Sequence, residues 1–178
     1  CLMQRTIPKD ILLASAFEIR LGESYDLNVL VDRLVRSGYK RAEQVEGQGQ
    51  FALRGGILDF FSPAHENPVR VEFFGDEPDT MGLFDTVSQR RIENLERAFI
   101  LPAAETLPQF HRDGLEGLLA DMDVLCTRLS KRKNPNQTLI NTIRSDMSRL
   151  ENELSLAPID RYMALIYERL ETAADYIP

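Results

Sequence analysis

The sequence has 178 residues, of which 43% are hydrophobic and 28% are charged. This size and composition are sufficient for one or two small domains with a buried core. The net charge of −7 argues against nucleic-acid binding by this chain alone, because phosphate binding requires clustered cations that release counterions. No apolar run is long enough to cross a membrane. Cys1 and Cys126 form neither a disulfide framework nor a zinc site, so we expect a reducing, cytoplasmic setting.

The N-terminal part of the sequence predicts a strand followed by a helix. An apolar stretch over residues 11–21 ends in alternation, which favours a strand. Asp26 is suited to cap the next element, because its carboxylate can accept the free backbone N–H groups of a first helical turn. Apolar residues then recur at helical spacing over residues 27–35, and Gly38 supplies a left-handed stop.

Turn-forming residues divide the next stretch into short strands. We expect these strands over residues 40–45, 50–53, 57–61, 69–73 and 79–84. Gly55 and Gly56 would form a bulge or a tight turn between two of them. Arg70 and Glu72 share one strand face because they are two residues apart. Together with the helix, these strands predict an α+β fold over residues 8–104, built on a small, mostly antiparallel sheet with one helix.

The second part of the chain, residues 105–178, is predicted to be helical. Apolar residues recur at helical spacing in two stretches, residues 115–129 and 140–154. Asn134 and Pro135 fit the cap and the first position of the second helix. Two helices with a short connection form an αα-hairpin. A last short helix is expected over residues 158–170.

Motifs that would indicate catalysis are missing from the sequence. It has no Gly-Lys pair for a phosphate-binding Walker A loop, and neither His65 nor His111 has a second candidate ligand at metal-site spacing. We therefore expect both histidines at the surface. Acidic residues near Asp59 and Glu72 could form a nuclease metal site, but residues 42–130 contain no lysine to stabilise developing charge. We expect no catalytic residue, no metal and no cofactor in this chain.

Arginine and phenylalanine side chains on the predicted strands are the candidates for binding a partner. Arg54, beside the glycine pair, is either a solvated strand residue, one in a local ion pair with Asp59 or Glu72, or an anchor for an acidic partner. Arg70 and Glu72 form either a charge ladder between strands or part of the same surface. Neighbours on a strand alternate, so one member of each phenylalanine pair should point outward; the pairs are Phe60 with Phe61, and Phe73 with Phe74. An exposed aromatic beside an arginine is typical of a binding hot spot, and burial by a loop is the alternative.

Five runs of residues carry a resemblance to a known family: Gly38–Val45, Phe51–Pro63, Val69–Glu77, Phe84–Arg90 and Ile100–Ala103. They resemble the UvrA-binding domain that UvrB shares with the bacterial transcription-repair coupling factors. The resemblance is strong over residues 8–104 and looser from there to Pro178. The triplets Glu43-Gln44-Val45 and Ser88-Gln89-Arg90, and the segment ending in Tyr176-Ile177-Pro178, favour the coupling factors over UvrB.

This resemblance implies a non-catalytic adaptor that recruits UvrA in nucleotide excision repair. It implies that UvrA is contacted by charged residues and by aromatic contact near a phenylalanine pair, namely Arg41, Arg54, Arg70, Glu72, Phe60 and Phe61. Ala52 stands where UvrB-like members often carry another arginine, so one contact would be lost. The alternatives are UvrB itself, a DNA-contacting module of an excision-repair helicase, and an enzyme with a metal site at Asp59 and Glu72.

The resemblance also implies the setting of the adaptor in its parent protein. The chain begins at Cys1 rather than at Met, and we expect it to be a piece of a longer protein. That parent would be an ATP-driven DNA translocase that displaces stalled RNA polymerase, with ATP and Mg²⁺ bound by a motor outside this piece. RNA polymerase and DNA would bind other parts, and a distant C-terminal domain would mask the UvrA-facing surface. Residues 105–178 would be the helical part of a degenerate helicase-like domain.

Overall fold

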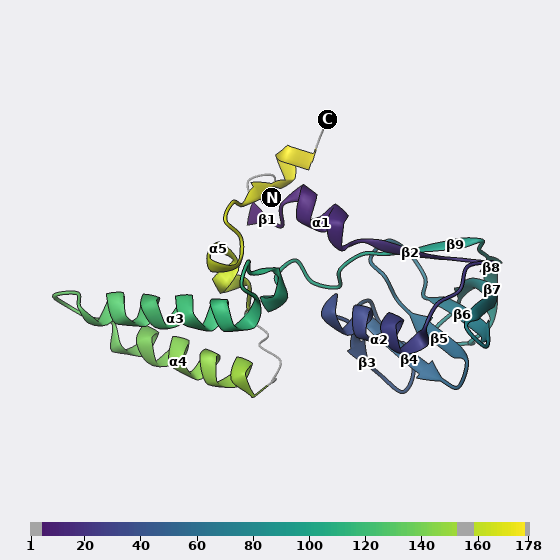
Figure 1. Cartoon of the computed structure of the whole chain (residues 1–178), viewed down its shortest axis with the longest axis horizontal. Helices are drawn as coiled ribbons and strands as arrows, with labels where there is room; N and C mark the ends of the chain where they lie inside the picture. Colours follow the sequence, from purple (N-terminus) through teal and green to yellow (C-terminus); the bar gives the residue numbers. More distant parts are fainter. Residues whose placement is uncertain (1–4, 153–158, 177–178) are drawn as a thin grey trace. The chain divides into compact units, whose positions relative to one another are not determined.

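A computed structural model describes residues 5–152 and 159–176 (Figure 1). The chain divides into two compact units, one of residues 9–104 and one that combines residues 1–8 with 105–178. The first unit is mixed and the second is mainly helical. The predicted α+β class with mostly antiparallel sheets is therefore confirmed.

The unit of residues 9–104 is built on a six-stranded sheet whose strands follow one another in chain order. These strands are β3 (Lys40–Arg41), β4 (Gln50–Arg54), β5 (Ile57–Phe60), β6 (Val69–Phe74), β7 (Glu77–Phe84) and β8 (Arg91–Asn94). The pair β3–β4 is parallel and the remaining pairs are antiparallel. A separate antiparallel pair consists of β2 (Phe17–Arg20) and β9 (Arg97–Ile100).

Helix α2 (Leu27–Arg36) begins and ends where its capping residues predict. The Asp26 carboxylate accepts the backbone N–H groups of Asn28 and Val29, and Gly38 follows the helix at a φ of +86°. Its buried residues, Leu30 and Leu34, pack in one apolar core with the sheet. The helix thus covers one face of the sheet.

Two of the strands expected in the first 45 residues are shorter in the structure than predicted. Residues Lys9–Ser15 form a helix, α1, and only the alternating end of the expected strand is extended, as β2. Leucine and alanine favour a helix intrinsically, so this apolar run suits a short helix as well as a strand. The strand expected over residues 40–45 is cut to Lys40–Arg41, because the Gln50 side chain accepts the backbone N–H groups of Glu46 and Gly47 in a following turn.

The core side of the sheet is made by alternate residues of its central strands. Buried side chains there are Phe51, Leu58, Phe60, Val69, Val71 and Met81, together with Phe17, Ile19, Ala98 and Ile100 of the β2–β9 pair. Strict alternation along β6 was predicted, and it is confirmed: Val69 and Val71 are buried whereas Arg70 and Glu72 are half-buried. The intervening residues therefore project from the opposite side of the sheet.

The second unit contains the predicted αα-hairpin, α3 (Gly114–Ser130) with α4 (Gln137–Glu151). The seam between these helices includes Leu118, Met122, Cys126 and Leu129 of α3 and Ile140, Ile143 and Leu150 of α4. Asn136 caps α4, with its side chain accepting the N–H of Leu139 at 3.0 Å, so the expected cap at Asn134 is wrong by two residues. Of the rest of the expected seam, Met147 is half-buried and Leu154 lies outside the described residues.

Short elements complete the second unit. They are β1 (Arg5–Thr6) paired with β10 (Glu171–Thr172), the 3-10 turns η1 (Pro108–Phe110), η2 (Ile159–Tyr162) and η3 (Ala173–Tyr176), and helix α5 (Met163–Ile166). The helix expected over residues 158–170 is thus a 3-10 turn and one helical turn, and Pro158 lies outside the described residues. Within residues 5–152 and 159–176, no helix is both long enough and apolar enough to span a membrane.

The two histidines are less exposed than expected. His111 is 5% exposed, and its Nδ1 accepts the backbone N–H of Asp113 at the start of α3. His65 is half-buried, and its Nε2 atom is buried without a hydrogen-bond partner among the described residues. Burial lowers the pKa of His65, which favours its neutral form. Both side chains belong to the packing of the fold.

Candidate functional site

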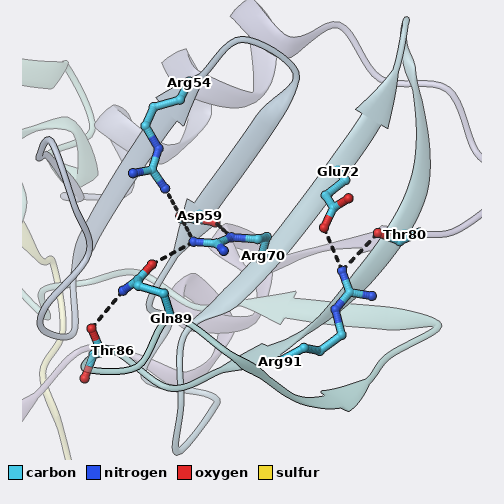
Figure 2. A network of polar contacts seen from close by, with 8 residues as sticks. All are labelled: Arg54, Asp59, Arg70, Glu72, Thr80, Thr86, Gln89 and Arg91. Carbon is cyan, nitrogen blue, oxygen red and sulfur yellow. Dashed lines mark hydrogen bonds and ion pairs between the residues drawn. The ribbon is translucent and has the colours of Figure 1, made fainter.

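Charged side chains gather on the side of the six-stranded sheet that faces away from α2. Here this charged face is defined by Arg54, Asp59, Arg70, Glu72 and Arg91 (Figure 2). Strand register brings them together, because Asp59 lies directly opposite Arg70 and Glu72 lies opposite Thr80. Residues directly opposite one another on paired strands point to the same side, so the sheet itself positions these groups.

Asp59 is the centre of the charged face, and its side chain is 1% exposed. Arg70 binds it with two parallel hydrogen bonds, Nε to Oδ1 at 2.7 Å and an Nη2 bond to Oδ2 at 2.8 Å. Arg54 donates a further bond from its own Nη2 to Oδ2, also at 2.8 Å. A buried carboxylate is stable only when it is paired and hydrogen-bonded, and two arginines fulfil this condition here.

The two arginines bound to Asp59 differ in their exposure and in the number of contacts that hold their side chains. Arg70 is 20% exposed; its guanidinium stands 4.4 Å from the centre of the Phe84 ring and also donates to Gln89. Hydrogen bonding to Asp59 raises the pKa of Arg70 above its ordinary value. Arg54 is 49% exposed and is held to Asp59 through Nη2 alone. Arg70 is therefore a fixed part of the face, whereas Arg54 keeps donors available to a partner.

A second charge pair lies beside the first. Arg91, on β8, donates to the Glu72 carboxylate at 2.9 Å and to the Thr80 hydroxyl at 3.0 Å (Figure 2). The side chains of Arg91 and Glu72 are 34% and 46% exposed, so both remain accessible while paired. Exposed pairs of this kind contribute little to stability, typically about 0.2–1 kcal/mol. Their position on the face allows them to rearrange toward a partner.

Arg41 does not lie with the other predicted contacts. Its strand, β3, is separated from β5 by β4, and the register pairs Arg41 with Phe51, whose side chain is in the core. Lys40 is paired with Gln50 instead, and therefore lies on the same side of the sheet as the charged face. Arg54, Arg70 and Glu72 are brought together by the structure, and Arg41 is exposed at the sheet edge.

The aromatic contact expected at Phe60 needs correction. Phe60 is 0% exposed in the core, so it cannot touch a partner. Phe61 is half-buried and packs against a small cluster of Val45, Ala52 and Phe84. The most exposed phenylalanine of these strands is Phe74, at 86%, on the same side of β6 as Arg70 and Glu72 by alternation. The sequence showed only that Phe73 or Phe74 should point outward, and it is Phe74.

The glycine pair beside Arg54 serves the sheet itself. Gly55 has a φ of +59°, as the tight turn between β4 and β5 requires. A Cβ atom on Gly56 would lie 2.9 Å from the carbonyl oxygen of Phe73, and the Phe73 N–H donates to the Gly56 carbonyl at 2.8 Å. The predicted tight turn is confirmed. The backbone that closely approaches Gly56 is the neighbouring strand β6.

The carboxylates considered for metal binding are engaged by arginines. Asp59 pairs with Arg54 and Arg70, and Glu72 pairs with Arg91. Within the part of the chain that the structure describes, no three His, Cys, Asp or Glu side chains are grouped to hold a metal ion. In the structure, both of these carboxylates are therefore partners of arginine in ion pairs.

A sheet face with paired charges and an exposed aromatic has the features of a protein-binding surface. The family model of the UvrB interaction domain matches residues 17–105, and the chain belongs to this family. The resemblance drawn from the sequence is thereby confirmed, and with it a place among DNA-repair adaptor regions.

Curated relatives of the chain are repair proteins from several bacteria. A transcription-repair-coupling factor from Myxococcus xanthus is 40% identical over 106 residues, which is 60% of this chain and 9% of the relative. The coupling factor of Bacillus subtilis is 31% identical over 173 residues, 96% of this chain and 15% of the relative. UvrABC system protein B of Thermotoga neapolitana is 32% identical over 117 residues, 65% of this chain and 18% of the relative. The chain thus spans less than a fifth of the length of each of these relatives.

Proposed function

We propose that this chain is the part of a transcription-repair coupling factor that recruits UvrA, through the charged face of its six-stranded sheet. The observation that carries this proposal is the sharing of one buried carboxylate, Asp59, by Arg54 and Arg70. The carboxylate balances one guanidinium, so one positive charge is left over. That charge is most accessible at Arg54, whose side chain is about half exposed.

The charge on this face differs in sign from the charge of the chain as a whole. Three arginines and two carboxylates define the face, giving a net charge of +1, against −7 for the sequence. An acidic patch on UvrA would complement such a face. Complementary charge of this kind speeds encounter and selects the correct partner more than it adds raw affinity.

A coupling factor is favoured over UvrB because of how far along the chain the similarity extends. The B. subtilis coupling factor matches 96% of the chain, including the helical unit, whereas the T. neapolitana UvrB protein matches 65%. The parent would use ATP and Mg²⁺ in a motor domain, displace RNA polymerase and bind DNA through parts outside this chain. Its C-terminal domain would compete with UvrA for the charged face. The chain itself would bind no cofactor and catalyse no reaction.

Calorimetric titration of the 178-residue chain with purified UvrA tests the proposal directly. We expect a saturable complex whose affinity falls as salt is raised, because exposed charges are screened at higher ionic strength. A titration with duplex DNA serves as the comparison. Absence of any heat with UvrA, from a chain shown to be folded by circular dichroism, would contradict the proposal; binding to DNA alone would replace it with a DNA-contacting role.

Phe74 offers a second test because its ring is almost entirely exposed. We expect Phe74→Ala to weaken UvrA binding about fivefold, since buried aromatic anchors dominate interface energetics. The free energy of unfolding should change by less than about 0.5 kcal/mol, because the side chain buries little surface in the free chain. Val29→Ala, on the outer side of α2 and 62% exposed, is the matched control and should bind normally. Equal affinities for the two variants would remove Phe74 from the interface.

A further inference from the structure

The turn between β7 and β8 contains a non-glycine residue in the left-handed backbone region. Gln89 has a φ of +60°, which costs free energy for a residue with a Cβ. The turn is closed by hydrogen bonds from the Asp85 N–H to the Arg90 carbonyl and from the Gln89 N–H to the Asp85 carbonyl. The Asp85 carboxylate also accepts the N–H and the hydroxyl of Ser88, each at 2.7 Å, and these bonds lower the pKa of Asp85. Asp85 and Ser88 therefore supply most of the hydrogen bonds within the turn, and the Gln89 amide adds one, to the Thr86 carbonyl.

The side chain of Gln89 instead connects the turn to the charged face. Its Oε1 accepts a hydrogen bond from Nη2 of Arg70 at 2.9 Å, and its Nε2 donates to the Thr86 carbonyl at 2.8 Å (Figure 2). The second bond fixes the orientation of the amide, so that its oxygen is the atom presented to Arg70. An amide anchored at one end and aimed at a guanidinium is well suited to orient that guanidinium.

Gln89 completes the set of contacts around Arg70. Asp59 binds one edge of the guanidinium through two bonds, and the Phe84 ring lies against its plane at 4.4 Å. The Nη2 group of Arg70 donates one hydrogen bond to Oδ2 of Asp59 and a second one to Oε1 of Gln89. Oδ2 also accepts the bond from Arg54, so a displacement of Arg70 would alter the atom that holds Arg54.

We propose that Gln89 is a positioning residue for partner binding, which holds Arg70 on Asp59 so that Arg54 is presented outward. This inference rests on the proposed function and identifies a determinant of the same surface. Gln89 acts through Arg70 and needs no contact with the partner. Pre-organisation of this kind lowers the entropic cost of binding, because the guanidinium is already in its bound orientation.

Gln89→Gly separates positioning from turn formation. Glycine adopts a φ of +60° without strain, which offsets the loss of the two side-chain hydrogen bonds of Gln89, so the free energy of unfolding should change little. It should nevertheless bind UvrA about threefold more weakly, because Arg70 is no longer held in its bound orientation before the partner arrives. Exchange of the Arg70 Nε–H with solvent, followed by ¹⁵N NMR of the free chain, should become faster. Gln44→Ala is the matched control, because Gln44 donates to the same Thr86 carbonyl without touching Arg70.

The outcomes of this experiment are distinct. Weaker binding and faster Arg70 exchange in Gln89→Gly, with the control unchanged in both, would support the inference. Wild-type affinity or unchanged Arg70 exchange in Gln89→Gly would overturn it. If the parent chain failed to bind UvrA at all, the proposed function would fall, and the exchange measurement would still report whether Gln89 orients Arg70.

Discussion

Arg54→Glu should weaken UvrA binding at least tenfold, the largest loss of affinity expected from any single exposed side chain on the charged face. The change removes the accessible positive charge and places a negative one in its position. Like charges brought together at an interface cost several kcal/mol. Because Arg54 is about half exposed, much of the loss should come from slower association, and the remaining binding should depend less on salt.

The same substitution should leave the fold intact. Asp59 keeps both bonds from Arg70 when Arg54 is lost, and an exposed glutamate can turn toward solvent. We expect the free energy of unfolding to fall by no more than about 1 kcal/mol, as for other partly exposed pairs. Arg36→Glu, on α2 and 74% exposed, makes the same change of charge away from the charged face. Surface plasmon resonance of both variants at two salt concentrations gives the comparison, and equal affinity for them would exclude Arg54 from the site.

Local signals in the sequence were sufficient for much of the sheet unit. Alternation along residues 69–73 predicted both the strand and the side on which Arg70 and Glu72 lie. Asp26 marked the start of α2 because capping depends on a few neighbouring residues. Residues 91–94 gave no such signal. All four residues of β8 are exposed on an edge strand, so burial imposes no alternating pattern there.

Contacts in the candidate site between residues on different strands could not be predicted from local sequence signals, because they depend on how the strands are aligned. The sequence indicated Asp59 both as a possible metal ligand and as a possible local partner of Arg54, and the second is confirmed. Its pairing with Arg70 was not foreseen, because that pairing is set by a register across the loop from residue 61 to residue 68. One signal was present: an acidic residue within the apolar run Ile57-Leu58-Asp59-Phe60 must find a partner if the strand is buried. The role of Gln89 had no comparable signal, because a positive φ at a glutamine is decided by the turn around it.

Asp59→Ala should destabilise the chain by about 3 kcal/mol, more than any other change to the charged face. Removing one partner of a buried ion pair leaves the other charge without compensation, at a typical cost of about 3–5 kcal/mol. Arg70 is only one-fifth exposed and would lose two hydrogen bonds, so it carries most of this cost. Arg54 can turn into solvent and adds little. Two cations would also be left close together, with no anion between them.

Urea denaturation of a small set of variants measures this effect and identifies its origin. Glu72→Ala, which removes an exposed carboxylate paired with an arginine on the same face, is the control and should cost less than about 1 kcal/mol. In the double variant Asp59→Ala, Arg70→Met, the unpaired cation is also removed. Its total loss should therefore be smaller than the sum of the two single losses, since residues in contact are energetically coupled. Additive losses, or a cost below about 1 kcal/mol for Asp59→Ala, would mean that solvent rather than Asp59 stabilises the charge of Arg70, and that the face is not organised around a buried carboxylate.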